Sequence, residues 1–286
     1  MRASRRPAGG RGAVLGSIDV TVSDRRIEDI LEPLRTRIGD AAVICDVDGT
    51  LAPIVSLPED AALLEGVHET LLVLRDRCRL LGFVSGRGLT DARRIVGLDG
   101  VAYAGNHGME IQRVGEEPGL AAGVAEHLAT IAAFEAAWPA ARLEPGDLRM
   151  EHKGATLSIH ARGARDPEAA RLLLAQIASE ALDRGLVPTP GREVLEVRPP
   201  VAIDKGTAVR AMLRGAGVRL ALYIGDDRTD ADAWKALRAM STEGALDVSV
   251  AVAVAAGEVP PAVREAADVE VPGPAGALQV LRFLAQ

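Results

Sequence analysis

Two aspartates, Asp46 and Asp48, are the first residues along this 286-residue chain whose type and spacing suggest chemistry. They lie in the sequence DVDGT at residues 46–50, directly after the apolar run AAVIC. A carboxylate at the end of a buried strand is costly unless another group compensates its charge, and open α/β sheets bind ligands at the carboxyl ends of their strands. Gly49 permits a sharp turn that brings both carboxylates to one site. A solvated turn after the strand is the alternative interpretation.

Three further aspartates, Asp226, Asp227 and Asp230, follow a second apolar run in the sequence GDDRTD. Packed beside Asp46 and Asp48, they would repel one another strongly without a cation. Magnesium suits a site that offers only oxygen ligands and is completed by water and phosphate. Capping of a helix N-terminus explains one of these acids but not all three. The pattern therefore predicts a magnesium site.

Two residues of other types could hold a phosphate. Ser85, in the sequence SGR after the apolar run LLGFV, offers a hydroxyl and nearby backbone N–H groups as an anion seat, although an ordinary serine turn explains it equally well. Lys205 opens a predicted helix over residues 206–213, where its charge opposes the helix dipole. Such a locally unfavourable choice often marks a functional site, and an ordinary surface lysine is the alternative.

Apolar runs that alternate with helical patterns must position these residues. Continuous apolar strands between helices are typical of a parallel sheet covered on both faces, so we predict a doubly wound, Rossmann-like α/β core. The predicted strands are 41–45, 80–84, 101–104, 220–224 and 248–254, and the predicted helices are 58–77, 90–96, 206–213 and 230–240.

The middle of the chain has a different pattern. Two helices, over residues 120–137 and 166–184, accompany two half-exposed strands, 155–160 and 193–197. This pattern predicts a small α+β cap domain, residues 113–199, inserted into a core formed by residues 25–112 and 200–286. Residues 1–24 are rich in Arg, Gly and Ala without periodicity, and we expect a flexible tail there.

Composition restricts the classes of function. The net charge of −7 with no long basic run disfavours binding to nucleic acid or to an anionic membrane. No apolar run is long enough for a membrane span and the N-terminal residues lack the apolar core of a signal peptide, so we expect a cytoplasmic protein. The two cysteines, Cys45 and Cys78, have no metal-ligand or disulfide pattern. The oligomeric state stays open.

The order D-x-D-G-T, S-G-R, K and G-D-D-x-x-D resembles that of the haloacid-dehalogenase-like phosphatase superfamily. The runs DVDGTLAPI, GNHGMEI, EHKGATLSIH, VLEVRPP, DKGTAV and GDDRTDADAW are similar to those of the trehalose-6-phosphate phosphatase family, in the insertion as well as the core. Cys45 departs from the larger residue usual in that family, and Ala231 departs from a frequent acid. Neither position carries a chemical role here.

The resemblance implies a magnesium-dependent hydrolysis of trehalose 6-phosphate through an aspartyl-phosphate, with roles for particular residues. Asp46 is the nucleophile and a metal ligand, and Asp48 is the acid and base and offers its backbone carbonyl to the metal. Asp226 is a further metal ligand, with Asp227 and Asp230 as support. Ser85 and Lys205 hold the phosphoryl oxygens.

The cap is expected to recognise the sugar through hydrogen bonds, since aromatic residues make up only 2% of the chain. The candidate substrate-binding residues are Asn106, His107, Glu151, Lys153, His160, Arg192 and Glu196. One alternative is a phosphatase of the same superfamily that acts on another sugar phosphate. Others are a sugar-phosphate-binding protein without catalysis and a phosphotransferase or mutase that uses the same aspartyl-phosphate chemistry.

Overall fold

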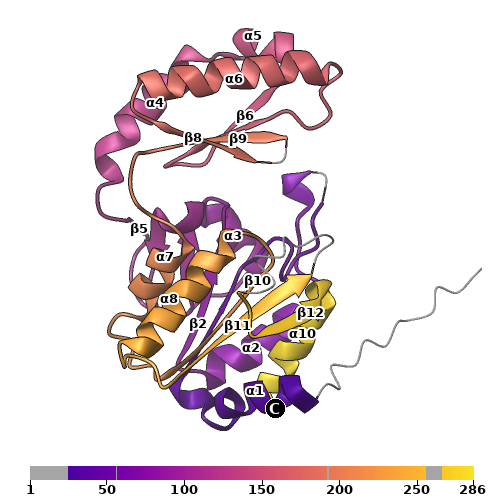
Figure 1. Cartoon of the computed structure of the whole chain (residues 1–286), viewed down its shortest axis with the longest axis vertical. Coiled ribbons are helices and arrows are strands. Elements are labelled where there is room, and N and C mark those ends of the chain that lie inside the picture. The colour runs from indigo at the N-terminus through magenta and orange to yellow at the C-terminus, as the bar shows by residue number, and fades with distance from the viewer. Residues whose placement is uncertain (1–24, 56, 192, 256–265) are drawn as a thin grey trace, which may run out of the picture.

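The computed structural model describes residues 25–55, 57–191, 193–255 and 266–286. The predicted tail, residues 1–24, and the candidate Arg192 lie outside these ranges. Within them, two bodies lie one above the other in Figure 1, each built around its own sheet.

The larger body contains an eight-stranded sheet in the order β12-β11-β10-β1-β2-β3-β4-β5. Pairing is parallel from β12 to β3 and antiparallel from β3 through β4 to β5. The strands are β1 (Ala41–Cys45), β2 (Leu80–Val84), β3 (Ala102–Gly105), β4 (Glu110–Gln112), β5 (Gly119–Leu120), β10 (Leu220–Gly225), β11 (Val248–Ala255) and β12 (Val269–Pro272). The predicted doubly wound α/β core is confirmed, and the central strands lie within a residue of the predicted ranges.

Helices cover both faces of this sheet (Figure 1), which is why the central strands read as continuous apolar runs. In β1 the consecutive residues Val43 and Ile44 pack into different cores, one on each face. One face is covered by α1 (Arg25–Thr36), α2 (Val67–Arg77), α3 (Leu89–Val96) and α10 (Gly273–Leu284), and the other by α7 (Lys205–Leu213) and α8 (Asp230–Thr242).

The first predicted helix, residues 58–77, is wrong in its first half. Residues 58–60 form a single 3₁₀ turn, and α2 starts only after Gly66, which has a left-handed backbone with φ 86°. The N–H of Leu64 donates to the carbonyl of Leu51, so tertiary contacts hold this segment as a loop. The apolar residues before Gly66 therefore reflect packing of a loop against the core, and only those from Val67 onward reflect helical periodicity.

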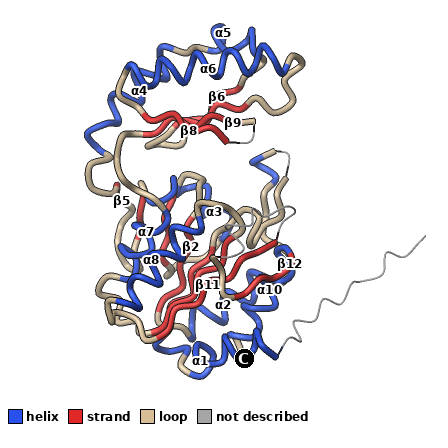
Figure 2. Tube along the Cα trace, viewed as in Figure 1, coloured by secondary structure: helices blue, strands red, loops and turns tan. Residues whose placement is uncertain are grey.

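The smaller body, which we call the cap, has an antiparallel sheet in the order β6-β7-β9-β8. Its strands are β6 (Arg149–His152), β7 (Leu157–His160), β8 (Val187–Gly191) and β9 (Val194–Arg198), and its helices include α4 (Leu128–Ala137), α5 (Ala140–Leu143) and α6 (Pro167–Asp183). The helices lie on the side of the sheet that faces away from the larger body (Figure 2). Their apolar side chains and the inner face of the sheet form a separate core. The larger body is therefore left facing the open side of the cap sheet.

Two strands of the cap were missed in the sequence. β6 has the polar sequence RMEH, and β8 contains two prolines, which a central strand excludes but an edge strand tolerates. The predicted helix over residues 120–137 is also too long, because α4 starts at Leu128 and Gly119–Leu120 forms β5. Since β5 pairs with β4, residues 119 and 120 lie on the large sheet. The exact limits of a core and a cap domain remain a prediction.

No helix in the described residues is long and apolar enough to cross a membrane.

Candidate active site

The predicted catalytic residues converge at the carboxyl edge of the large sheet. β1 lies between β2 and β10, so the segments that follow these three strands meet at one place. The N–H of Asp46 donates to the carbonyl of Ile224 at 2.8 Å, which holds the first aspartate beside the end of β10. Ser85 is fully buried after β2, where its Oγ accepts from the backbone N–H of Arg87 at 3.1 Å.

Lys205 is the buried cation of this site. Its side chain is 2% exposed, and Nζ donates to Asp46 Oδ1 at 2.9 Å and to Asp230 Oδ1 at 2.7 Å. Burial lowers the pKa of Lys205, but the charges of Asp230 and Asp46 outweigh burial and raise the pKa well above its ordinary value. The helix that carries Lys205 begins with a capping box formed by Asp204 and Thr207, which offsets the unfavourable position of a lysine in the first turn.

Asp230 is the most completely bonded acid of the site. Oδ1 accepts from Lys205 and from the Tyr223 hydroxyl, which lies 2.7 Å away, and Oδ2 accepts the backbone N–H groups of Asp226 and Asp227 at 3.0 and 2.9 Å. The last two bonds join the backbone of the loop after β10 to the start of α8. Tyr223 was not identified from the sequence, because an aromatic residue inside an apolar strand reads as core.

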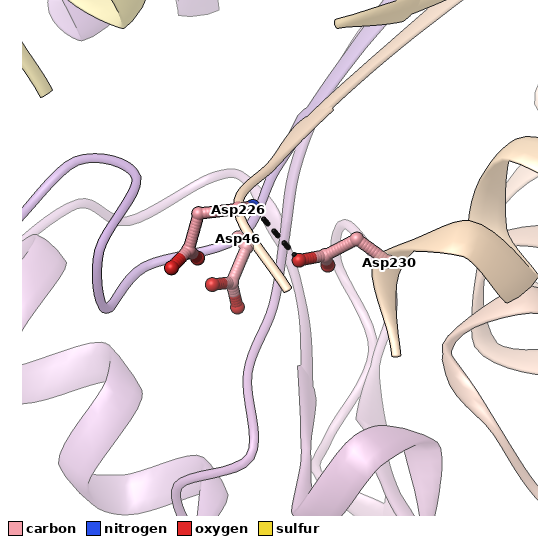
Figure 3. A group of neighbouring side chains, drawn as sticks. All are labelled: Asp46, Asp226 and Asp230. Atoms are coloured by element: carbon pink, nitrogen blue, oxygen red, sulfur yellow. Dashed lines mark hydrogen bonds between the residues drawn. The ribbon is translucent and has the colours of Figure 1, made fainter. Parts of the chain in front are cut away.

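Carboxylate oxygens of Asp46, Asp226 and Asp230 lie within 4.8 Å of one another (Figure 3). Burial and then the charges of Asp230 and Asp227 raise the pKa of Asp226 to about 7. Burial likewise raises the pKa of Asp46. One lysine does not compensate this group of acids, so the site is suited to a further cation.

The surroundings of Asp226 fit a small, hard cation. Gly49 has φ +77°, and a Cβ there would lie 2.1 Å from Asp226 Oδ2, so only glycine leaves room for this carboxylate. Thr50 donates to the other oxygen at 3.2 Å. Asp46 and Asp226 offer oxygen ligands only, as Mg²⁺ prefers. Because Asp230 already uses both oxygens, Asp46 and Asp226 fit the cation better.

Asp48 lies at the side of the site in a bidentate ion pair. Arg87 Nε and the Nη2 nitrogen donate to its two oxygens at 2.7 and 2.9 Å, and Arg87 also donates to Asp91 at 2.6 Å. The sequence motif SGR contained Arg87, but no role was assigned to it. Arg87, which lies two residues before α3, thereby orients the Asp48 carboxylate and leaves it about one third exposed.

A cavity of about 400 Å³ joins these core residues to the cap. Four of the predicted cap residues line it: Glu151, Lys153, His160 and Glu196. His107 lines it from the core. On the open face of the cap sheet, Glu151 pairs with His160 at 2.8 Å, while Lys153 and His107 each lie 3.6 Å from Glu196.

The charges around Glu196 stabilise its carboxylate. Burial raises the pKa of Glu196, but contact with His107 and the charges of His107, Lys153 and Arg198 lower it to about 2. The hydrogen bond from His160 lowers the pKa of Glu151 despite burial. Both acids are therefore ionised near neutral pH and present acceptors to a ligand.

Asn106 does not line this cavity, unlike the other described candidates of the substrate-binding set. It is 1% exposed, and its amide bonds to Glu110 and to the loop that follows β6. Direct contact of Asn106 with substrate therefore stays a prediction, and in this structure its amide faces the protein interior. The sequence alone did not reveal that an amide in the run GNHG turns toward the protein interior.

A second cavity of about 720 Å³ adjoins the first and shares Asp48, Ile54, Arg87 and His160 with it. It is also lined by Arg149. Arg149 lies two residues before Glu151 on β6 and so shares its face of the sheet. Because β6 was not predicted from the sequence, this spacing identifies Arg149 only once the strand is known. The two cavities together leave room for a ligand larger than a phosphate.

Comparisons with known proteins agree with this arrangement. A family model described as Trehalose-phosphatase matches residues 44–265. A trehalose-phosphate phosphatase of Mycolicibacterium paratuberculosis is 33% identical over 255 residues, which cover 81% of this chain and 62% of that protein. An uncharacterised glycosyl hydrolase of Mycobacterium tuberculosis is 36% identical over 204 residues, which cover 69% of this chain and 15% of that protein. The chain thus spans less than two thirds of the length of these relatives.

Solved structures share the fold. A trehalose-6-phosphate phosphatase related protein has a TM-score of 0.70 at 22% identity and covers 85% of this chain and 96% of its own. The C-terminal domain of a Candida albicans trehalose-6-phosphate phosphatase has a TM-score of 0.71 at 21% identity, covering 90% and 96%. A haloacid dehalogenase-like hydrolase from Bacteroides thetaiotaomicron has a TM-score of 0.57 at 15% identity, covering 85% and 98%. Since the family model spans most of the sequence, including the acidic motifs and the cap, the chain belongs to the trehalose-phosphatase family.

Proposed function

We propose that this chain hydrolyses trehalose 6-phosphate to trehalose and phosphate in a magnesium-dependent reaction. The observation that carries the proposal is the contact of Lys205 with Asp46 and Asp230 at the floor of a cavity whose far wall is the polar face of the cap. A carboxylate paired with a lysine therefore lies below, and charged groups suited to sugar hydroxyls lie above. The choice of substrate is supported by the family, since the related mycobacterial proteins carry the name trehalose-phosphate phosphatase.

In the proposed first step an oxygen of Asp46 attacks phosphorus, and the bond from phosphorus to the sugar oxygen breaks. Asp48 gives its proton to the leaving sugar oxygen. Asp48 then takes a proton from water, whose oxygen attacks the aspartyl-phosphate and releases phosphate from Asp46. Arg87 holds both oxygens of the ionised Asp48 carboxylate in this structure, so in the proposed first step one of these two bonds opens and the freed oxygen carries the proton.

Lys205 and Ser85 are proposed to bind the phosphoryl oxygens. Positioning and electrostatic stabilisation supply most of the catalysis in phosphoryl transfer. Asp46, Asp226 and the backbone carbonyl of Asp48 would hold Mg²⁺, which when bound neutralises charge on the phosphoryl group. Asp227 and Asp230 are proposed as supports that orient the loop and Lys205.

The cap residues Glu151, Lys153, His160 and Glu196 are proposed to bind the hydroxyls of the disaccharide. Their charged groups are arranged as acceptors and donors along one sheet face, which suits a ligand with many hydroxyl groups. His107 is proposed to contribute from the core. Arg149 is added here because it lines the adjoining cavity on the same face.

The test is phosphate release from a panel of esters that includes trehalose 6-phosphate, sucrose 6-phosphate, glucose 6-phosphate and p-nitrophenyl phosphate, with magnesium and with chelator. Strong preference for trehalose 6-phosphate that chelator removes supports the whole proposal. Preference for another sugar phosphate keeps the core chemistry and rejects the substrate. Absence of release from every ester rejects hydrolysis and favours a binding protein, and transfer of phosphate to an added sugar favours a phosphotransferase.

A further inference from the structure

Two hydrogen bonds join the core to the loop of the cap that carries Lys153. Asn106, at the end of β3, donates from Nδ2 to the backbone carbonyl of Lys153 at 2.5 Å. The hydroxyl of Thr156 donates to Asn106 Oδ1 at 2.8 Å. Both side chains are almost completely buried, with exposures of 1% and 2%. One amide therefore holds both ends of the loop formed by residues 153–156.

The same amide is tied to the catalytic edge. Glu110 Oε2 accepts from Asn106 Nδ2 and from the backbone N–H of Leu89, both at 2.8 Å. Leu89 begins α3, the helix that directly follows the segment of Ser85 and Arg87. The loop on the cap, the end of β3 and the start of α3 thus share one hydrogen-bond network.

The loop is also fitted sterically against the core. Gly154 has φ +78°, and a Cβ at this position would lie 2.9 Å from Glu110 Oε1. Ala155 is fully buried in a small apolar cluster with Met109 and Val124, against which Val201 and Ile203 pack. Polar and apolar contacts together make this loop part of the core surface, although it lies between two cap strands.

We propose that Asn106 is a positioning residue that acts through Lys153. By tying the backbone of the loop to the core, it keeps the Lys153 ammonium in the cavity, 3.6 Å from Glu196. Asn106 and Thr156 thereby determine the affinity for substrates that reach the cap and not the rate of the chemistry at Asp46. This inference rests on the proposed function only in assigning Lys153 to the sugar.

The primary test compares Thr156→Val with Thr156→Ser. Valine keeps the shape of threonine and removes the hydroxyl, which leaves Asn106 Oδ1 buried without its donor, whereas serine retains the hydroxyl.

The second pair of variants is Asn106→Gly and Asn106→Asp. Because Asn106 has φ +49°, both replacements suit the left-handed backbone, and alanine does not. Aspartate places an acceptor against the Lys153 carbonyl and Glu110.

Each variant is assayed with trehalose 6-phosphate and with p-nitrophenyl phosphate, which has no sugar hydroxyls for the cap to bind. We expect Thr156→Val to raise KM for trehalose 6-phosphate about tenfold, equal to about 1.4 kcal/mol. Thr156→Ser should stay within about twofold, and p-nitrophenyl phosphate should be hydrolysed at the wild-type rate by both. Asn106→Asp should raise KM at least as much as Thr156→Val. Amide hydrogen exchange of residues 152–157 should be faster in Thr156→Val than in Thr156→Ser.

An unchanged KM in both Thr156→Val and Asn106→Gly would overturn the inference, as would an equal loss with both esters, which indicates general structural damage. If wild-type enzyme prefers another sugar phosphate, the substrate proposal fails, and the KM of each variant relative to wild type, measured with that ester, tests Asn106. If wild-type protein hydrolyses no ester, amide hydrogen exchange of residues 152–157 tests the role of the loop contact. Equal exchange in Thr156→Val and Thr156→Ser would then reject the role of the loop contact.

Discussion

The catalytic edge of the core and the open face of the cap are both built from charged residues, but they hold them in different ways. At the edge, Lys205 contacts two carboxylates at 2.9 and 2.7 Å, and all three side chains are almost fully buried. On the cap face, Glu196 lies 3.6 Å from both Lys153 and His107, and its side chain is 18% exposed. The charges around Lys205 are therefore buried and in direct contact, while those around Glu196 are farther apart and partly exposed.

The difference matches what each region would have to do. Charge that develops on a phosphoryl group is stabilised best by groups that need no reorganisation, which a buried and fully bonded network provides. Recognition of many hydroxyl groups requires donors and acceptors whose own partners can be exchanged for the ligand. We expect substitutions in the core to affect both chemistry and folding, and substitutions in the cap to affect mainly affinity.

The largest effect is expected for Asp46→Asn. The amide has nearly the shape of the carboxylate but is a poor nucleophile, so turnover should fall at least about 10⁴-fold, which corresponds to about 5.5 kcal/mol. Phosphate release measures the loss, and circular dichroism checks the fold. Asp99→Asn is the matched control, because the Asp99 side chain is 95% exposed. An active Asp46→Asn enzyme would remove the proposed nucleophile from the core.

The next effect is expected for Lys205→Met, which keeps the length of the side chain and removes its charge. Asp46 and Asp230 would then be buried without their cation, and loss of one partner from a buried ion pair costs about 3–5 kcal/mol of stability. Urea unfolding with chelator present measures this cost. Lys235→Met, on the exposed surface of α8, is the control. Wild-type stability in Lys205→Met would show that the buried carboxylates of Asp46 and Asp230 do not need the charge of Lys205.

Acidification should lower the free energy of unfolding through protonation of Glu196. Its pKa is lowered from 4.5 to about 2, so its stabilising contribution is present above about pH 4.5 and is lost as the pH falls toward 2. Between pH 5.5 and pH 3, wild-type protein should lose about 2 kcal/mol more free energy of unfolding than Glu196→Gln does. Urea unfolding at the two pH values measures the difference. Equal losses would mean that Lys153 and His107 do not stabilise this carboxylate.

The smallest effect is expected in catalysis by Glu196→Gln itself. The variant keeps one acceptor oxygen but loses the charge that faces Lys153, so KM for trehalose 6-phosphate should rise about tenfold, or about 1.4 kcal/mol, while kcat changes less than about threefold. Steady-state kinetics with that ester measure both constants. A fall in kcat with KM unchanged would place Glu196 with the chemistry of the core and would remove the contrast between the two regions.

Some parts of the molecule were predictable because their signals are local. The run at residues 41–45 gave the bounds of β1 without error, since a strand buried on both faces must be apolar throughout. The helix start at Pro167 was within one residue of its prediction, because Asp166 caps it and accepts from two backbone N–H groups. β6 and β8 escaped prediction, since a polar strand and a strand with two prolines are defined only by the strands beside them.

The amino-acid sequence by itself determined the α/β core, the order of the acidic motifs and the family, because these depend on residue type and spacing along the chain. The tertiary structure alone decided what each side chain faces. It turned Asn106 away from the cavity and toward Thr156, fifty positions later, and it placed Tyr223 beneath Asp230. It also brought Arg87, which follows β2, into contact with Asp48, which follows the neighbouring strand β1. Contacts between residues so far apart depend on how the sheet and the cap pack, and no local pattern records them.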